Sequence, residues 1–276
     1  MKKLIINFTP TGMIPTKEMT PFVPITPNEI IEQVHEAFDL GITMVHLHAR
    51  DSKTEQPTHK MEEYSLILEG VRRHCKSLVT CLSLSGRSVN EFEQRSECLE
   101  LMPDMASLTL SSLNFTKQPS VNSPEMIGLL AKKMKEYGVK PELEIFDIGM
   151  INYGDYLIKK GIIAAPLYYN IILGNISGLQ IDFSHIGTAV NSLPNGSIWS
   201  LGGIGNSQLP AATFAIAGGG GVRIGLEDNI YFNKSRTKKA TNIELIARVH
   251  TLAEMFEREV MTPKEFGDKG FYNKNR

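Results

Sequence analysis

The chain has 276 residues, of which 42% are hydrophobic, and it carries a net charge of −1 with a pI near 6.7. No basic block appears, so nucleic acid and anionic membrane surfaces are not expected as partners. The apolar runs fall short of the ~18 residues of a membrane span and, behind the N-terminal lysines, of the ~7 residues of a signal-peptide core. Three cysteines without a Cys-x-x-Cys pair favour a reducing, cytoplasmic setting.

Short apolar runs alternate with segments of helical periodicity along the whole chain, and no change of composition marks a linker. The first helix is well delimited, because Thr26 and Glu29 form a capping box and Gly41 ends the periodic pattern. In chain order, the expected strands are 4–8, 44–49, 78–83, 105–110, 141–147, 167–173, 198–201 and 221–226. The expected helices are 26–41, 61–74, 90–101, 123–138, 151–160, 179–193, 209–217 and 242–257.

Strand and helix thus alternate about eight times. Alternation of this kind predicts a parallel sheet, and eight units predict a closed (β/α)8 TIM barrel, an α/β fold, as a single domain over residues 1–276. An open doubly wound sheet is the alternative. Its G-x-G-x-x-G fingerprint is missing after the first strand, where the chain has only Thr11, Gly12 and Met13.

The second strand ends in two histidines, His46 and His48, which alternation places on one face. Two imidazoles at a strand end can bind one metal ion, although hydrogen bonds could also satisfy them. Glu227 follows the last strand and offers a third ligand, because closure of a barrel brings its last strand beside its first. Two histidines and a carboxylate suit catalytic zinc and also iron(II). A salt bridge to Arg223 is the alternative for Glu227.

Other expected strands also end in polar side chains, and the C-terminal strand ends are where TIM barrels carry their chemistry. A glycine run at 218–221 either cradles phosphate or forms a tight turn, and the sequence leaves both open. A cofactor with phosphates would lie near this run and near residues 202–205. The polar strand-end residues are Ser83, Ser85, Ser107, Thr109, Glu142, Glu144, Asn170, Arg223, Glu227 and Asp228.

Five motifs, taken together and in this order, carry a family resemblance. They are VHLHAR at 45–50, MASL at 105–108, LNF at 113–115, PELE at 141–144 and GLEDN at 225–229. Over nearly its whole length the chain resembles the β-keto acid cleavage enzymes. The resemblance implies a zinc-dependent TIM barrel that converts a 3-oxo acid and acetyl-CoA into acetoacetate and the CoA ester of the remaining acyl group. It also implies a homotetramer.

The resemblance further implies roles for individual residues. Zinc, which can stabilise a developing enolate as a Lewis acid, is bound by His46, His48 and Glu227. Arg223, Asp228 and Glu144 handle the carboxylate and protons of the substrate, with Asp228 beside Arg223 as a general base. The substrate site is lined by Ser83, which could donate a hydrogen bond or relay the proton, and by Ser107, with Ser85 and Thr109 at neighbouring strand ends.

One position departs from a branch of this family. The enzymes that cleave an amino-substituted keto acid carry a glutamate in the loop after the first strand, where this chain has Ile14. Isoleucine cannot pair with an ammonium group, so we expect Met13 and Ile14 to face an apolar or uncharged substrate tail, unless Ile14 is simply buried against the barrel.

Two other functions stay open. A metal-dependent aldolase or hydrolase could use the same ligands without CoA, and dependence of turnover on acetyl-CoA separates the two. A catalytically silent barrel that binds a metabolite would predict a broken ligand set, whereas every ligand is present.

Overall fold

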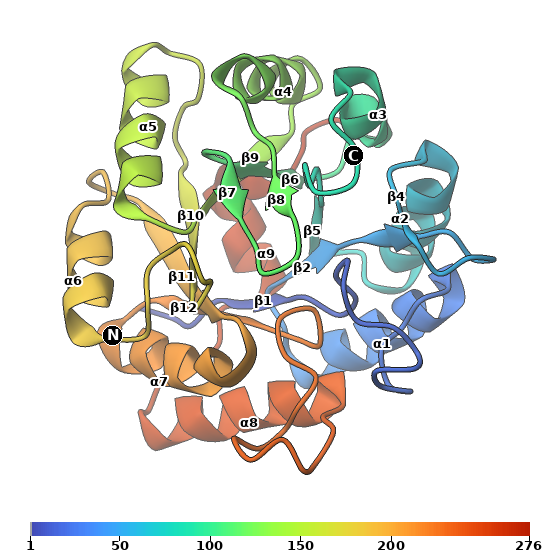
Figure 1. The fold of residues 1–276 in the computed structure, drawn as a ribbon, viewed down its shortest axis with the longest axis vertical. Coiled ribbons are helices and arrows are strands. Elements are labelled where there is room, and N and C mark those ends of the chain that lie inside the picture. The colour runs from blue at the N-terminus through green and yellow to red at the C-terminus, as the bar shows by residue number, and fades with distance from the viewer. Residues whose placement is uncertain (1) are drawn as a thin grey trace.

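Eight parallel strands close into a barrel in the computed structural model, which describes residues 2–276 (Figure 1). The pairing of the last barrel strand with the first sets Arg223 beside Asn7 and closes the ring. This confirms the predicted (β/α)8 barrel and excludes the open sheet. The barrel strands are β1 (Ile6–Phe8), β2 (Met44–Leu47), β5 (Val79–Leu82), β6 (Met105–Thr109), β9 (Lys140–Ile145), β10 (Tyr168–Leu173), β11 (Ile198–Gly203) and β12 (Gly221–Ile224).

Helices surround the barrel (Figure 1). The first has the predicted capping box, in which Thr26 and Glu29 each accept a backbone N–H of the other, and Gly41 ends it with φ +97°. No helix within residues 2–276 is long and apolar enough to cross a membrane. The main helices are α1 (Pro27–Leu40), α2 (Met61–His74), α3 (Phe92–Ser96), α4 (Pro124–Glu136), α5 (Ile148–Lys159), α6 (Phe183–Asn191), α7 (Gln208–Gly218) and α8 (Asn242–Met255).

Several element boundaries differ from those expected. The helix expected over 90–101 is the short α3 followed by a 3-10 turn at Glu97–Leu101. Helix α5 begins earlier than expected because the Asp147 carboxylate accepts the Met150 N–H at 3.2 Å and caps it. Strand β9 therefore ends at Ile145, before the cap. In the same way, Asp182 caps α6 and moves its start to Phe183.

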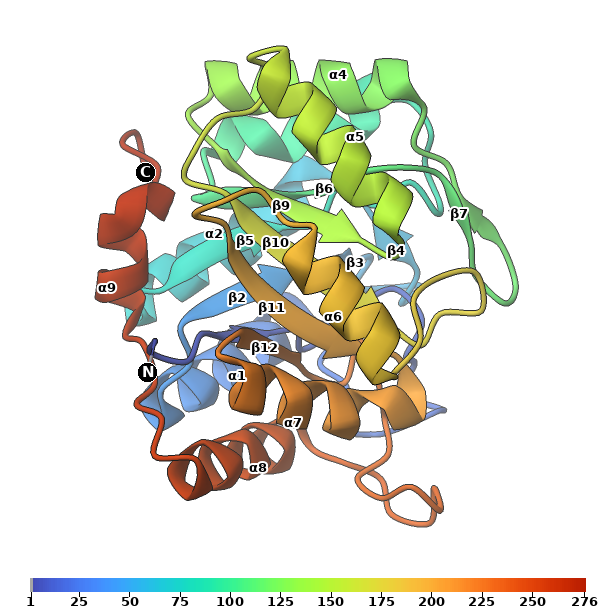
Figure 2. The ribbon, with the colours of Figure 1, turned by 90° about the vertical axis from the view of Figure 1, so that its left-hand side faces the viewer.

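The two ends of the barrel are covered by elements that the sequence analysis does not predict. Two hairpins, β3 (Ala49–Arg50) with β4 (Pro57–Thr58) and β7 (Leu113–Asn114) with β8 (Pro119–Ser120), extend the loops after β2 and β6. Helix α9 (Pro263–Phe266) lies at the opposite end from β7, as Figure 2 shows. Phe266 and Phe271 stack there with ring centroids 4.3 Å apart. The C-terminal segment thus closes the end of the barrel that lies opposite the β7–β8 hairpin.

Asp104 ties this C-terminal segment to the barrel. The residue is fully buried just before β6. Its carboxylate accepts the backbone N–H groups of Thr80 and Asn273, each at 3.0 Å, and the Thr80 hydroxyl at 3.1 Å. Arg276 adds an ion pair at 3.2 Å. One side chain therefore satisfies buried donors from two parts of the chain that lie far apart in sequence.

Replacing Asp104 with alanine should lower the free energy of unfolding by about 3–5 kcal/mol, because several buried donors lose their acceptor at once. Urea unfolding followed by circular dichroism measures the change. Asp155→Ala, which removes only the surface pair with Lys159, is the control and should cost less than about 1 kcal/mol. A shift for Asp104→Ala as small as that of the control would contradict the anchoring role.

Candidate active site

A cavity of about 490 Å³ opens at the C-terminal ends of the barrel strands. Four expected site residues at or just after the strand ends, Ile14, Ser83, Ser85 and Thr109, line it. Ser107 is not among the lining residues, since its hydroxyl accepts the Leu84 N–H at 3.1 Å and supports the loop after β5. The other expected residues that line the cavity are His48, Glu144, Arg223, Glu227 and Asp228.

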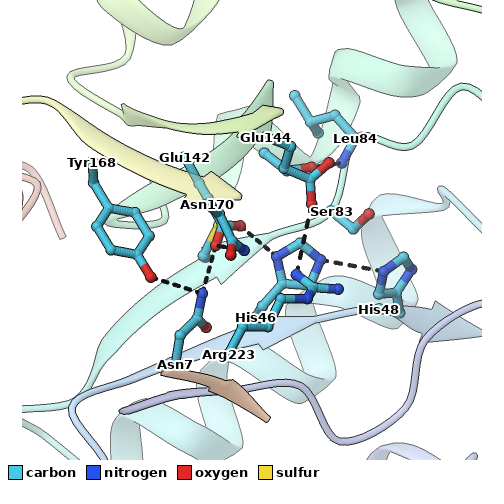
Figure 3. A network of polar contacts seen from close by, with 12 residues as sticks. Asn7, His46, His48, Ser83, Leu84, Glu142, Glu144, Tyr168, Asn170 and Arg223 are labelled. Atoms are coloured by element: carbon cyan, nitrogen blue, oxygen red, sulfur yellow. Dashed lines mark hydrogen bonds and ion pairs between the residues drawn. The ribbon is translucent and has the colours of Figure 1, made fainter. Parts of the chain in front are cut away.

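The three candidate metal ligands converge at the base of this cavity, which His48 and Glu227 line and beside which His46 is buried. The Nε2 atoms of His46 and His48 lie 3.2 Å apart, and His48 Nε2 lies 3.1 Å from Glu227 Oε1 (Figure 3 shows the two histidines). One ligand atom from each residue falls within 4.8 Å of the others. The alternation of side chains along β2 and the closure of β12 onto β1 produce this convergence.

The surroundings of these ligands fit a divalent cation. His46 Nδ1 lies 2.6 Å from Glu142 Oε2, which is the carboxylate–histidine contact that orients metal-bound imidazoles. Burial disfavours charge on His46, but Glu142 and Glu227 outweigh it and raise its pKa to about 9. Positive charge is thus favoured between the ring and Glu227, and a metal ion would take the place of the proton. Glu227 Oε2 has no hydrogen-bond partner among the described residues, which leaves a lone pair for such an ion.

Glu142 is held by a second layer of buried side chains. Its Oε1 accepts the side-chain amides of Asn7 at 2.6 Å and Asn170 at 3.0 Å, and the Cys81 thiol lies 3.2 Å from Oε2. Burial opposes ionisation of Glu142, yet His46 and Arg223 hold its pKa at about 2. The carboxylate is therefore charged and fixed. Asn7 was not an expected site residue, although its place on β1 next to β2 could have indicated it.

Arg223 is shared by three carboxylates. Its Nε donates to Asp228 Oδ2 at 2.8 Å, its Nη2 donates to Glu227 Oε1 at 2.6 Å, and Glu144 Oε1 lies 3.7 Å from Nη1. The salt bridge that was the alternative for Glu227 therefore exists together with its contact to His48. Burial raises the pKa of Asp228 and of Glu144 above their usual values in spite of this guanidinium. Asp228 consequently combines a fixed position with an increased proton affinity.

The loop after β1 is fixed over the cavity by Arg50. The buried guanidinium donates to the carbonyl oxygens of Gly12 at 2.9 Å and Pro15 at 2.6 Å. Gly12 has φ +67°, and a Cβ there would lie 2.5 Å from Cγ of Glu227, so the loop packs directly against a candidate ligand. Ile14 is 47% exposed and faces the cavity, which argues against burial of this side chain against the barrel.

Arg87 lines the cavity but was not predicted as a site residue. It follows the polar run after β5, and its guanidinium lies 3.3 Å from the centroid of the Phe115 ring. The Arg87 guanidinium makes no hydrogen bond or salt bridge to any other residue within residues 2–276. A cation after a polar strand end was the available signal, but the stacking partner lies in the unpredicted hairpin β7–β8.

The glycine run at 218–221 lies before β12, at the end of the barrel away from the cavity. Gly219 has φ +82° and ends α7, and a Cβ on Gly220 would fall 1.9 Å from the Trp199 ring. These glycines form the tight helix-to-strand turn. This geometry supports the tight-turn alternative, and none of the four glycines lines either of the two described cavities.

Sequence comparison decides the family. A sequence model of the beta-keto acid cleavage enzyme matches residues 3–268. The chain belongs to this family. Among family relatives, 3-oxoadipate:acetyl-CoA acetyltransferase of Cupriavidus necator is 36% identical over 94% of this chain and 91% of its own. The 3-keto-5-aminohexanoate cleavage enzyme of Acetoanaerobium sticklandii is also 36% identical, over 96% of this chain and 97% of its own.

The solved structure of ObcA has the same fold and is more distant in sequence than these two relatives. The apo structure of ObcA superposes with a TM-score of 0.76 at 19% identity, and the match covers 92% of this chain and 66% of that chain. This β-keto acid cleavage enzyme therefore shares the barrel of ObcA while spanning about two thirds of its length.

Proposed function

We propose that this family member converts a 3-oxo acid and acetyl-CoA into acetoacetate and the CoA ester of the remaining acyl group, at a zinc ion bound by His46, His48 and Glu227. The observation that carries the proposal is the convergence of these donors at the base of one cavity. The name of the relative from Cupriavidus necator supports acetyl-CoA as co-substrate. A bound zinc ion supplies Lewis acidity toward the oxygens of the keto acid.

Proton removal from C2 of the substrate is the first step that the protein's own groups can perform. Asp228 combines a raised pKa with a carboxylate fixed by Arg223, which suits a general base. The C2 carbanion then forms a bond to the thioester carbonyl carbon of acetyl-CoA, and the CoA thiolate leaves. Ser83, on the cavity wall, donates a hydrogen bond to the reacting oxygens or relays the proton.

Cleavage follows when the thiolate attacks C3. The C2–C3 bond breaks, its electron pair stays on C2, and the acyl group leaves as a CoA ester. Asp228 returns its proton to C2, which completes acetoacetate. Glu144 accepts the Thr109 hydroxyl at 2.8 Å and has a raised pKa caused by burial, so it can hold a proton beside this centre.

Charged residues of the cavity wall recognise the carboxylate of the substrate, and apolar residues recognise its tail. Arg223 Nη1 has no hydrogen-bond partner among the described residues, so Arg223 and Arg87 together supply positive charge for the carboxylate of the substrate. Ser85 lines the same wall, whereas Ser107 supports it through the Leu84 N–H. Met13 and Ile14 contact an apolar or uncharged tail, in contrast to the aminated substrate named for one relative.

Three broader proposals accompany this function. We propose that residues 1–276 act as a single domain, that the enzyme is cytoplasmic, and that it is a homotetramer as its family resemblance implies. The cytoplasmic setting is supported by the three cysteines, which are all free and buried.

The reaction is tested with zinc-quantified protein, acetyl-CoA and a panel of 3-oxo acids with apolar, charged and aminated tails. We expect acetoacetate and the matching acyl-CoA in equal amounts, with the highest kcat/KM for uncharged tails. Turnover without acetyl-CoA would instead support the aldolase or hydrolase alternative. Absence of turnover across the panel, with zinc bound, would refute the proposed reaction.

His46→Ala should lose zinc and activity together, because two remaining ligands bind the ion poorly. Zinc per protomer, measured by mass spectrometry after dialysis, provides a readout apart from turnover. His35→Ala, which removes a half-exposed surface histidine, is the control and should retain zinc. Stoichiometric zinc in the His46 variant would refute the ligand assignment.

Asp228→Asn should keep zinc and lower kcat by about 10²–10⁴-fold, because an amide cannot accept the C2 proton. Hydrogen–deuterium exchange at C2 of the 3-oxo acid, followed by NMR, should slow in parallel. Asp39→Asn on the surface is the control. If both rates match those of the wild type, Asp228 is not the base.

A further inference from the structure

A second cavity, of about 520 Å³, adjoins the active-site cavity. The two share Gly205, in the loop after β11, and Asn229, in the loop after β12. The Gly205 N–H donates to the Asp228 carbonyl oxygen at 2.8 Å, so the boundary between the cavities lies directly beside the proposed base. A long ligand can therefore occupy both cavities and keep one end at the reaction centre.

The loop that forms the rim of this second cavity is rich in positive charge. Residues 229–241 contain four lysine or arginine residues and no carboxylate. Lys234 lines the cavity and is exposed, and exposed Arg236 extends over Gly205, with Nη2 3.4 Å from where a Cβ would stand. Only Lys238 of these cations pairs with a carboxylate among residues 2–276, that of Glu244.

The cavity interior carries no negative charge. Arg248 is among its lining residues, and none of the described lining residues is Asp or Glu. Phe214 also lines it and packs edge-on against Phe183 of α6, with ring centroids 5.0 Å apart. Phe183 is 80% exposed, which leaves a ring face beside the cavity available for stacking.

The position in the barrel points to the same kind of ligand. Strands β11 and β12 are the seventh and eighth of the barrel, and the loops after these strands form the phosphate sites of many TIM barrels. The unpaired cations Lys234 and Arg236, the aromatic face of Phe183 and the junction with the active-site cavity at Gly205 and Asn229 match a thioester on a long arm that ends in a phosphorylated adenosine.

We propose that the second cavity and the loop 231–239 bind the phosphorylated nucleotide end of acetyl-CoA, while its thioester reaches Asp228 past Gly205 and Asn229. This inference rests on the proposed function and assigns the co-substrate its site. Lys234 and Arg236 contact the phosphates, and the adenine lies against Phe183 and Phe214.

The test compares acetyl-CoA with S-acetyl-N-acetylcysteamine, a thioester that lacks the nucleotide and its phosphates. The double variant Lys234→Gln/Arg236→Gln should raise KM for acetyl-CoA about tenfold or more, because two charge-assisted contacts are lost. Its kcat, and its kcat/KM for the truncated thioester, should match the wild type. Lys132→Gln/Lys135→Gln on the exposed face of α4 removes the same charge elsewhere and is the control.

Calorimetric titration of the zinc-loaded protein with coenzyme A gives a readout that does not depend on turnover. The double variant should bind coenzyme A about tenfold more weakly than the wild type and the control, and adenosine 3′,5′-bisphosphate should compete for the wild-type site. Equal binding by all three proteins, or an equal loss of kcat/KM for both thioesters, would overturn the site. If no thioester is turned over by any protein, the proposed reaction fails, and the titration alone decides the coenzyme A site.

Discussion

The upper part of the barrel depends on one buried cation. Arg223 forms ion pairs with Glu227, Asp228 and Glu144, and its field also lowers the pKa of Glu142. Burying four carboxylates near one another without such a partner would cost several kcal/mol per group and would drive them to protonate. With the guanidinium in place, Glu227 stays ionised as a ligand, while burial still leaves Asp228 with a raised pKa. Arg223 on β12 thus lies between two acids with opposite pKa shifts, lowered for Glu227 and raised for Asp228.

Strand geometry sorts the carboxylates into two levels. Glu142 and Glu144 are two positions apart on β9, so both point into the barrel, but at different depths. The deeper Glu142 orients His46 and is surrounded by amides, whereas Glu144 reaches the cavity and Thr109. The same spacing separates His46 from His48. The two-residue period of a strand therefore produces one layer of side chains at the cavity and a deeper layer that orients them.

The features that the sequence predicts well are those that follow from periodicity. Alternating apolar runs fix eight strands and eight helices, and barrel closure brings Glu227 to His48 across most of the chain. Features that depend on one specific tertiary contact were missed. Asn7 matters only because β9 delivers Glu142 opposite it, and Arg87 only because a short hairpin supplies Phe115. Ser107 looked equivalent to Ser83, yet a backbone N–H takes up its hydroxyl.

The glycine run at 218–221 is a motif whose composition alone does not reveal its role. Its composition suits phosphate, but its place before β12 is decided by where the strand begins, and the Trp199 ring occupies the space above it. Conversely, the near-neutral charge of the whole chain conceals the local excess around Lys234 and Arg236, which becomes meaningful once the fold sets it beside a cavity.

The hydrogen bonds from Arg50 to the loop after β1 affect which residues of this loop can change without loss of its backbone conformation. Arg50 holds the carbonyl oxygens of Gly12 and Pro15, which every amino acid would present, and leaves the side chains between them free. Residues 13 and 14 can therefore be exchanged without altering the backbone that abuts Glu227. Substitutions at these two positions can therefore change selectivity for the substrate tail. Gly12 cannot be substituted in the same way, because it packs directly against the proposed metal ligand Glu227.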